Sequence, residues 1–169
     1  MKFYFWVFCI TFSYFQNVYA DENIAYIYDG DTVKIHAETG DIKLRLSEID
    51  APEFNQPYGK KARRVLSKLC TKTAAIQVEI SGTDRYDRQL GHLTCNGNDV
   101  AMYLVAHGYA WHYAYYSHNV DLASAQILAQ VHHLGLWKNL DAVAPWIWRK
   151  NHPNYYSRHY IKYSIIDKS

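Results

Sequence analysis

The segment NIAYIYDGDTVKIHAETGDIKLRL, residues 23–46, contains three stretches in which apolar and polar residues alternate. Alternation of this kind is typical of strands that place one face in a core. The pairs Asp29-Gly30 and Gly40-Asp41 separate the three stretches, and Asp-Gly between alternating runs is a strong hairpin signal. The segment therefore predicts a three-stranded antiparallel meander at the start of a folded domain.

The alternation breaks at the end of the third stretch, where the next apolar residue is Ile49. One extra residue near Ser47-Glu48 would return Ile49 to the core, as a β-bulge does. The same slip moves Asp50 to the face that carries Arg45, because side chains alternate between the two faces of a strand. We therefore expect a cation and an anion to meet on the side away from the core.

Two more alternating stretches and three helical patterns follow in the chain. The alternating stretches are 74–80 and 89–95, and the helical patterns lie within 59–72, 100–108 and 121–135. Five short antiparallel strands remove most exposed edges when they close into a small barrel. The sequence therefore predicts an α+β fold, mainly β, in which a five-stranded OB-fold barrel carries three helices.

At 169 residues the chain has room for one compact domain. Residues 1–20 combine a single charge, an apolar run and the small residues Val18 and Ala20, as a cleaved secretory signal peptide does. A retained membrane anchor is the alternative, although the apolar run is short for a span. We divide the chain into this signal peptide, a domain over 21–144 and a C-terminal extension over 145–169. A secreted or periplasmic protein with no membrane contact after cleavage is expected.

Cleavage would remove Cys9 and leave Cys70 and Cys95 in a compartment where thiols tend to oxidise. We expect a disulfide between these two residues. Two inert buried thiols are the alternative, because the sequence alone does not show whether the positions approach each other. The sequence has no CxxC pair and no HExxH motif, so its nine histidines do not predict a zinc site.

The formal net charge is only +2, but the basic residues are concentrated in two segments. Residues 59–72 contain lysines and arginines without any acid, and residues 145–169 combine basic residues with tryptophans and tyrosines. Both segments suit a polyanion that carries stackable bases. The alternative is that they are solvated faces of basic helices.

Several polar residues at strand ends could perform chemistry together. Asp31 and Asp50 are short carboxylates that can converge on a hard cation, although aspartates at such positions also form turns and caps. Glu53 lies three residues beyond Asp50 and could act as a general base through a water molecule. The guanidinium groups of Arg45 and Arg88 can bind phosphate oxygens through pairs of N–H donors. The set suits attack of water on a phosphodiester.

Four motifs, DGDTVKI, RLSEIDAPE, YGKKA and DRYDRQLGHL, occur in an order and with separations that resemble the thermonuclease family. These are secreted calcium-dependent nucleases similar to staphylococcal nuclease. The resemblance runs from about Asn23 to Trp137. It implies that calcium is the cofactor and that Asp31, Asp50 and the backbone carbonyl of Ala51 bind it.

The resemblance also implies roles for the residues around the metal. Asp29 matches an acid that lies just outside the metal ligands, and Glu53 matches the glutamate that activates or orients the attacking water. Arg45 and Arg88 match the two arginines that hold the scissile phosphate, and Arg88 is placed to help the leaving oxygen.

Further positions match contacts to the nucleotide. Arg85 and Tyr86 match a cation and a tyrosine that contact the terminal phosphate, and Tyr113 and Tyr115 lie near a tyrosine that flanks the base. The chain departs from the family at Asp87, where a glycine is more usual. Asp tolerates a positive φ better than most residues, so we expect this change to alter rate or preference without abolishing activity.

These observations predict a calcium-dependent nuclease that cleaves DNA and RNA to 3′-phosphorylated products, as a monomer without a stable protein partner. The alternative is a noncatalytic OB-fold module that binds nucleic acid through the same basic face. The presence of the acidic residues favours the enzyme, because carboxylates near a phosphate weaken binding unless a metal neutralises them.

Overall fold

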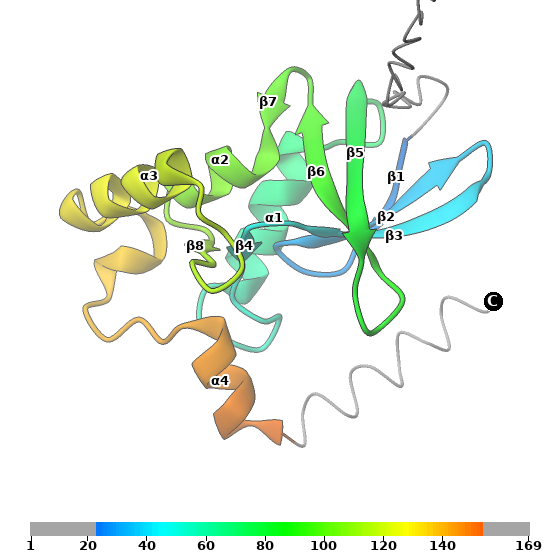
Figure 1. Cartoon of the computed structure of the whole chain (residues 1–169). Coiled ribbons are helices and arrows are strands. Elements are labelled where there is room, and N and C mark those ends of the chain that lie inside the picture. The colour runs from blue at the N-terminus through cyan, green and yellow to red at the C-terminus, as the bar shows by residue number, and fades with distance from the viewer. Residues whose placement is uncertain (1–22, 154–169) are drawn as a thin grey trace, which may run out of the picture.

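The computed structural model describes residues 23–153 (Figure 1). The expected signal peptide over 1–20 and the end of the C-terminal extension lie outside the described residues. In chain order the strands are β1 (Asn23–Ile27), β2 (Thr32–Ala37), β3 (Gly40–Leu46), β4 (Ile49–Asp50), β5 (Ile76–Thr83), β6 (Gln89–Cys95), β7 (Asn98–Asp99) and β8 (Trp111–His112). The helices are α1 (Gly59–Leu69), α2 (Val100–Ala106), α3 (Val120–Val131), the 3₁₀ helix η1 (Gly135–Lys138) and α4 (Pro145–Asn151).

The predicted meander is present as β1, β2 and β3, which pair in antiparallel order. Val33 on β2 faces Ile27 on β1 and Leu44 on β3 in this register. Ala37 pairs with Gly40, so the second turn lies at residues 38–39 and not at Gly40-Asp41 as predicted. The alternation of apolar residues therefore identified the strands, and the turn lies two residues earlier than its Gly-Asp signal indicated.

The main sheet has the order β1-β2-β3-β6-β5, with β7 paired to β6, and β4 pairs with β8 in a second, two-stranded sheet. The mixed α+β class with mainly strands is confirmed. Within residues 23–153 no ladder joins β1 to β5, so the predicted closed barrel is not found there. The strands β4, β7 and β8 exceed the predicted five, because two-residue pairings leave no periodicity in the sequence.

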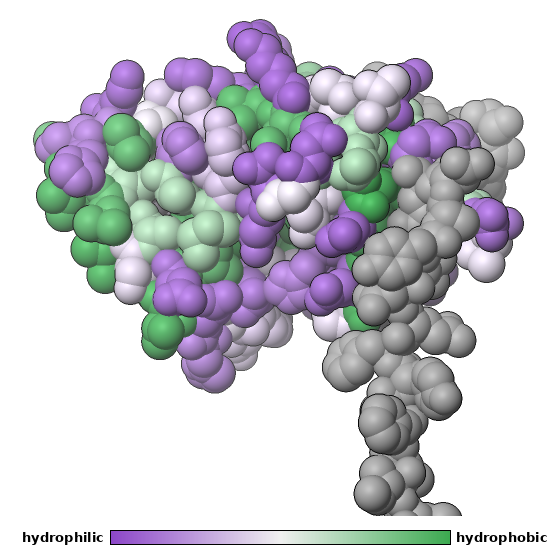
Figure 2. Space-filling model, turned by 90° about the horizontal axis from the view of Figure 1, so that it is seen from above, coloured by the Kyte–Doolittle hydropathy of each residue, from purple (hydrophilic) through white to green (hydrophobic). Residues whose placement is uncertain are grey.

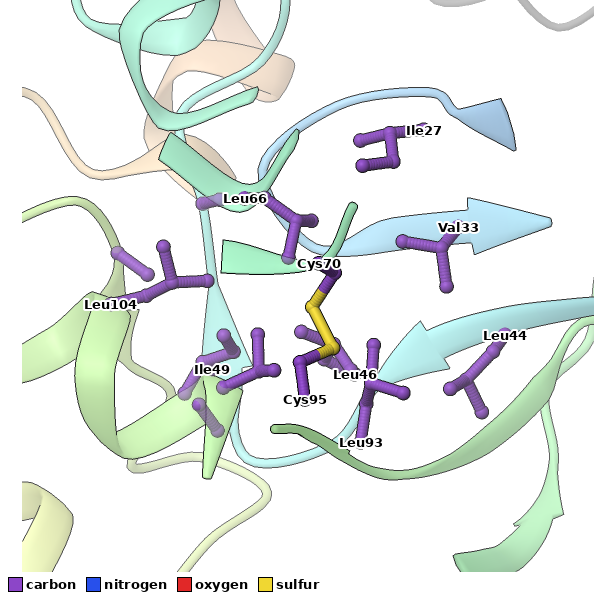
Figure 3. Packing of buried hydrophobic residues seen from close by; sticks show 14 of the residues in the cluster. Ile27, Val33, Leu44, Leu46, Ile49, Leu66, Cys70, Leu93, Cys95 and Leu104 are labelled. Atoms are coloured by element: carbon purple, nitrogen blue, oxygen red, sulfur yellow. A yellow bond between two sulfur atoms is a disulfide. The ribbon is translucent and has the colours of Figure 1, made fainter. Parts of the chain in front are cut away.

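The hydrophobic core lies between the meander, β6 and the helices α1 and α2. Figure 3 shows side chains from these elements converging on the disulfide between Cys70 and Cys95. This disulfide, predicted from the cysteine count, joins the end of α1 to the end of β6 across a Cα–Cα distance of 5.4 Å. The labelled core residues are Ile27, Val33, Leu44, Leu46, Ile49, Leu66, Leu93 and Leu104.

The first predicted helix is present as α1, which buries Ala62 and Leu66 and exposes its lysines. The third predicted helix is shorter than expected, since α3 ends at Val131 and His133 has a left-handed φ of 50°. α3 leaves much of its apolar surface exposed, and Figure 2 shows hydrophobic side chains gathered at the edge where this helix lies. None of the helices within residues 23–153 has the length and apolar character that crossing a membrane requires.

Candidate active site

The break after β3 directs the chain into the candidate site. β3 ends at Leu46, Glu48 adopts a left-handed φ of 66°, and β4 begins at Ile49. Ile49 is only 1% exposed, so the prediction that it returns to the core is confirmed. The predicted bulge is instead a turn between two strands, because the left-handed residue ends the pairing of β3 and starts β4 in a new direction. Asp50 follows at once and is buried as deeply as Ile49.

Arg45 holds the two aspartates that were predicted to bind a cation. Its Nη2 lies 2.9 Å from Oδ1 of Asp50, and its Nε lies 3.1 Å from Oδ1 of Asp31. Its Nη1 donates to the carbonyl oxygens of Leu46 at 2.6 Å and Ile49 at 2.9 Å. The predicted meeting of Arg45 and Asp50 is therefore found, and the guanidinium also fixes the backbone turn that delivers Asp50.

The loop between β1 and β2 carries Asp29 and Asp31 to the same place. Asp29 Oδ1 accepts from the backbone N–H groups of Asp31 at 3.0 Å and Thr32 at 2.8 Å, which shapes the loop as a local Asx turn. Asp31 Oδ2 accepts from the N–H of Ala51 at 2.6 Å. This bond joins the loop to the segment after β4, so Asp31, Asp50 and the backbone of Ala51 lie together.

Glu53 lies in a loop that packs tightly against the start of α1. Its N–H donates to Oε1 of Gln56 at 3.1 Å, and its carbonyl accepts from the N–H of Gln56 at 2.8 Å. A Cβ at Gly59 would collide with the carbonyl oxygen of Glu53, so only glycine fits at this first position of α1. The glycine of the YGKKA motif thus permits the close approach that holds Glu53 near Asp50.

A residue that sequence reasoning did not assign to the site lies at its centre. Arg149 on α4 places Nη1 2.9 Å from Oδ1 of Asp50 and 2.9 Å from Oε1 of Glu53, and places Nη2 2.7 Å from Oδ2 of Asp50. Figure 1 shows α4 beside the loop between β4 and α1, which contains Glu53. The sequence signal for Arg149 was its position in the basic, aromatic extension, and no spacing connected it to the acidic residues.

The cluster contains four carboxylates and two arginines, so it keeps an excess of negative charge. Withdrawal from water, followed by the charges of Asp31 and Glu53, raises the pKa of Asp29 well above its ordinary value. Burial also raises the pKa of Asp50, against the opposing hydrogen bond from Arg149. Carboxylate oxygens are hard donors, and uncompensated negative charge favours a hard cation such as calcium. Within residues 23–153 no three such side chains are placed to hold a metal ion together, so the chemistry of the donors, and not their present geometry, suits the predicted ion.

Arg88 lies in the loop between β5 and β6 and is held by Asp84, through Nε at 2.8 Å and Nη2 at 2.7 Å. Burial would raise the pKa of Asp84, but hydrogen bonds from Arg88 and Tyr86 outweigh it and lower that pKa. Asp87 in this loop has a left-handed φ of 62°, as expected for a position where glycine is usual. Arg85 stacks on the ring of Tyr86 at 4.8 Å. Within residues 23–153 no hydrogen bond or ion pair joins Arg88 to the carboxylate cluster.

The two tyrosines predicted near the base differ in their surroundings. Tyr113 stacks on Trp146 of α4, with 5.1 Å between ring centroids and 9° between planes. Burial and the charge of Asp50 raise the pKa of Tyr113, and a hydrogen bond with Arg149 opposes them, so the phenol lies at the carboxylate cluster. Tyr115 is 81% exposed, so its ring is open to solvent.

Glu48 also has a role that the sequence did not indicate. Its carboxylate accepts from Oγ of Ser117 at 2.8 Å and from Nδ2 of Asn119 at 3.4 Å. Its carbonyl oxygen accepts from the N–H of Tyr113 at 2.8 Å. Glu48 therefore fastens the loop that carries the two tyrosines to the turn before Asp50.

Comparison with known proteins places the chain among nucleases. The family described as Staphylococcal nuclease homologue matches residues 43–139. A protein of Haemophilus influenzae named as an uncharacterized endonuclease is 36% identical over 125 residues, covering 73% of this chain and 70% of that protein. A micrococcal nuclease of Shigella flexneri is 35% identical over 139 residues, covering 76% of this chain and 79% of that protein. A staphylococcal-like nuclease of Arabidopsis thaliana is 38% identical over 109 residues, and the match spans 64% of this chain but only 33% of the plant protein.

Proposed function

Because this chain belongs to the staphylococcal nuclease homologue family, we propose that it is a nuclease that hydrolyses phosphodiester bonds of nucleic acids. One observation carries the proposal. Asp31 from the loop before β2 and the neighbouring Asp50 and Glu53 meet in one charged cluster, where Arg45 and Arg149 hold them. A module that only binds nucleic acid needs the cations but gains nothing from buried acids beside a phosphate.

Calcium is the cofactor that we propose for this site. Asp31 and Asp50 would hold the ion with the backbone carbonyl of Ala51, because all three supply hard oxygen donors. When bound, the ion neutralises part of the acidic cluster and polarises the phosphodiester.

Residues of the chain would carry out the other steps of phosphodiester hydrolysis. Glu53 would orient a water molecule and accept its proton as the water attacks phosphorus. Arg45 would stabilise the negative charge that develops on the phosphate oxygens, and Arg88 would exchange Asp84 for a phosphate oxygen. Cleavage on the 5′ oxygen side would leave 3′-phosphorylated products from DNA and from RNA. Arg85, Tyr86 and Tyr115 lie at exposed positions from which they could contact the nucleotide.

We also propose that the protein acts outside the cytoplasm, secreted or in a periplasm, as a monomer. The disulfide between Cys70 and Cys95 supports this location, because disulfides persist in oxidising compartments.

The test uses the mature chain, residues 21–169, incubated with single-stranded DNA or with RNA in calcium or in a chelator. We expect cleavage in calcium only, with 3′-phosphate ends on the products. Glu53→Gln should lower kcat about 10²-fold or more, because the general base is lost. Glu79→Gln, which changes an exposed glutamate on β5, is the matched control. Binding of DNA without cleavage in both conditions would leave the noncatalytic module as the function.

A further inference from the structure

The short helix α4 is anchored at the site by its aromatic residues. Trp146 stacks on Tyr113 and meets Trp111 edge-on, with ring centroids 5.6 Å apart. Trp148, two residues along the helix, lines a small pocket together with Pro52 and Gln56 from the loop of Glu53. α4 thus contacts both the segment that carries the tyrosines and the segment that carries the proposed base.

The linker that leads into α4 is fastened to the same loop. Nε2 of Gln56 donates to the carbonyl oxygen of Val143 at 2.7 Å, while Oε1 of Gln56 accepts from the N–H of Glu53. Gln56 is buried, so this bridge is shielded from water. One side chain therefore connects the backbone of Glu53 to the segment that places Arg149.

Arg149 forms a bridge between two carboxylates. Its Nη1 is shared by Asp50 and Glu53, and its Nη2 binds the second oxygen of Asp50. A planar guanidinium presents its donors in a fixed fork, so two carboxylates on one fork have a fixed mutual orientation. Nη2 of Arg45 also donates to Oδ1 of Asp50, which is the oxygen that accepts from Nη1 of Arg149.

We propose that Arg149 is a positioning residue of the active site, which holds Glu53 and Asp50 in a fixed orientation for catalysis. This inference rests on the proposed function, since it places the proposed base relative to a proposed cation ligand. It extends the site on the C-terminal side of residues 43–139, the part that matches the family, because Arg149 lies on the helix that follows.

The hydrogen bonds indicate that Arg149 can stay in place when a cation binds. A carboxylate oxygen has about two lone-pair sites. Within the described residues, Oδ2 of Asp50 accepts only from Arg149, and Oδ2 of Asp31 accepts only from Ala51. Each aspartate therefore keeps capacity for an ion while Arg149 remains bound.

The positive charge of Arg149, in contrast, should weaken the binding of calcium. A positive guanidinium against Asp50 weakens the attraction of the cluster for a second positive charge. Loss of Arg149 should therefore weaken catalysis and strengthen calcium binding. A residue that only stabilised the fold would not produce these opposite changes.

The experiment compares Arg149→Ala and Arg149→Lys with Lys150→Ala, which removes the same charge from an exposed neighbour on α4. Steady-state cleavage of a single-stranded oligonucleotide gives kcat and KM, and calorimetric titration without substrate gives the calcium Kd. For Arg149→Ala we expect kcat to fall about 10²-fold, with a much smaller change in KM, as for a misplaced reacting group. The calcium Kd should become smaller.

Two further readouts complete the design. Arg149→Lys should restore part of kcat, and millimolar guanidinium should restore part of the kcat of Arg149→Ala. Lys150→Ala should match the wild-type chain in every measurement.

Three results would overturn the proposal. The first is an unchanged kcat in Arg149→Ala, and the second is a higher rate, which would make Arg149 a blocking residue. The third is a loss of kcat together with weaker calcium binding and no guanidinium rescue, which would make its role structural. If the wild-type chain itself did not cleave, the proposed function would fail, and the calcium titration would still decide whether Arg149 acts on Asp50.

Discussion

At the scale of single residues, Glu48 both forms the turn between β3 and β4 and binds the loop that carries the site tyrosines. Glu48 is a non-glycine residue with a positive φ, which is an uncommon conformation. Its carboxylate accepts from Ser117, whose side chain is buried, and from Asn119. The contacts with the loop beyond β8 therefore hold the residue in a backbone conformation that its own preferences disfavour.

Substitution of Glu48 by alanine tests this role. Glu48→Ala keeps a Cβ, so the conformational cost of the positive φ remains. It removes the carboxylate that accepts from Oγ of Ser117. We expect a loss of about 1–3 kcal/mol in the free energy of unfolding, because a buried hydroxyl loses its acceptor. Glu48→Gln, which keeps one oxygen acceptor, should lose less. Urea denaturation measures both, and equal losses in the two variants would contradict the explanation.

The residues of the site differ in how far the sequence could predict them. Arg45 and Asp50 are five residues apart, so the strand period and one slip predict their contact. Arg149 is 99 residues from Asp50, and Glu48 is 69 residues from Ser117. No local period relates such positions, because tertiary packing alone brings them together.

At the scale of secondary structure elements, periodicity decides what could be predicted. The five longer strands and the helices α1, α2 and α3 have repeating apolar positions, and the sequence predicted all of them. β4 and β8, of two residues each, are too short to show a period, and α4 is as long as α2 but has its apolar residues Trp146, Ile147 and Trp148 in one run. These short elements are placed by long-range contacts, such as the pairing of Asp50 with Trp111 and the stacking of Trp146 on Tyr113.

The disulfide between α1 and β6 gives a prediction at this scale. It closes a loop with a sequence separation of 25 residues, so its removal should cost about 3 kcal/mol of stability through the entropy of the unfolded chain. The variant Cys70→Ala/Cys95→Ala should melt at a lower temperature and should cleave at a near-normal rate below its melting point. Thermal unfolding of both chains with and without reductant measures the melting temperatures. Reductant should not change the melting temperature of the variant. An equal melting temperature in oxidised and reduced wild-type protein would contradict a stabilising bridge.

At the scale of the whole molecule, stability should depend on pH through His112 on β8. This side chain is buried, and its Nε2 has no hydrogen-bond partner among residues 23–153. Burial lowers the pKa of His112 below the ordinary 6.5, and the charge of Glu48 only partly opposes it. Below about pH 6.5 the unfolded chain therefore binds a proton that the folded chain resists, so stability falls as the pH decreases.

The prediction can be separated from the titration of the acidic residues. Asp84 and Asp41 have lowered pKa values, so the stability that they contribute is lost only as the pH falls below the ordinary carboxyl range near 3.8. Asp29 and Asp50 have raised pKa values, so the stability that they contribute is lost as the pH rises, and they oppose the effect of His112. These two carboxylates are present both in the wild-type chain and in His112→Gln, so the difference between the chains reports on His112. As the pH decreases from 7.5 to 5.5, the free energy of unfolding of the wild-type chain should decrease relative to that of His112→Gln. His118→Gln, which removes an exposed imidazole, is the control for the loss of a histidine. Equal slopes in the wild-type and His112→Gln chains would show that another group governs the pH dependence of this fold.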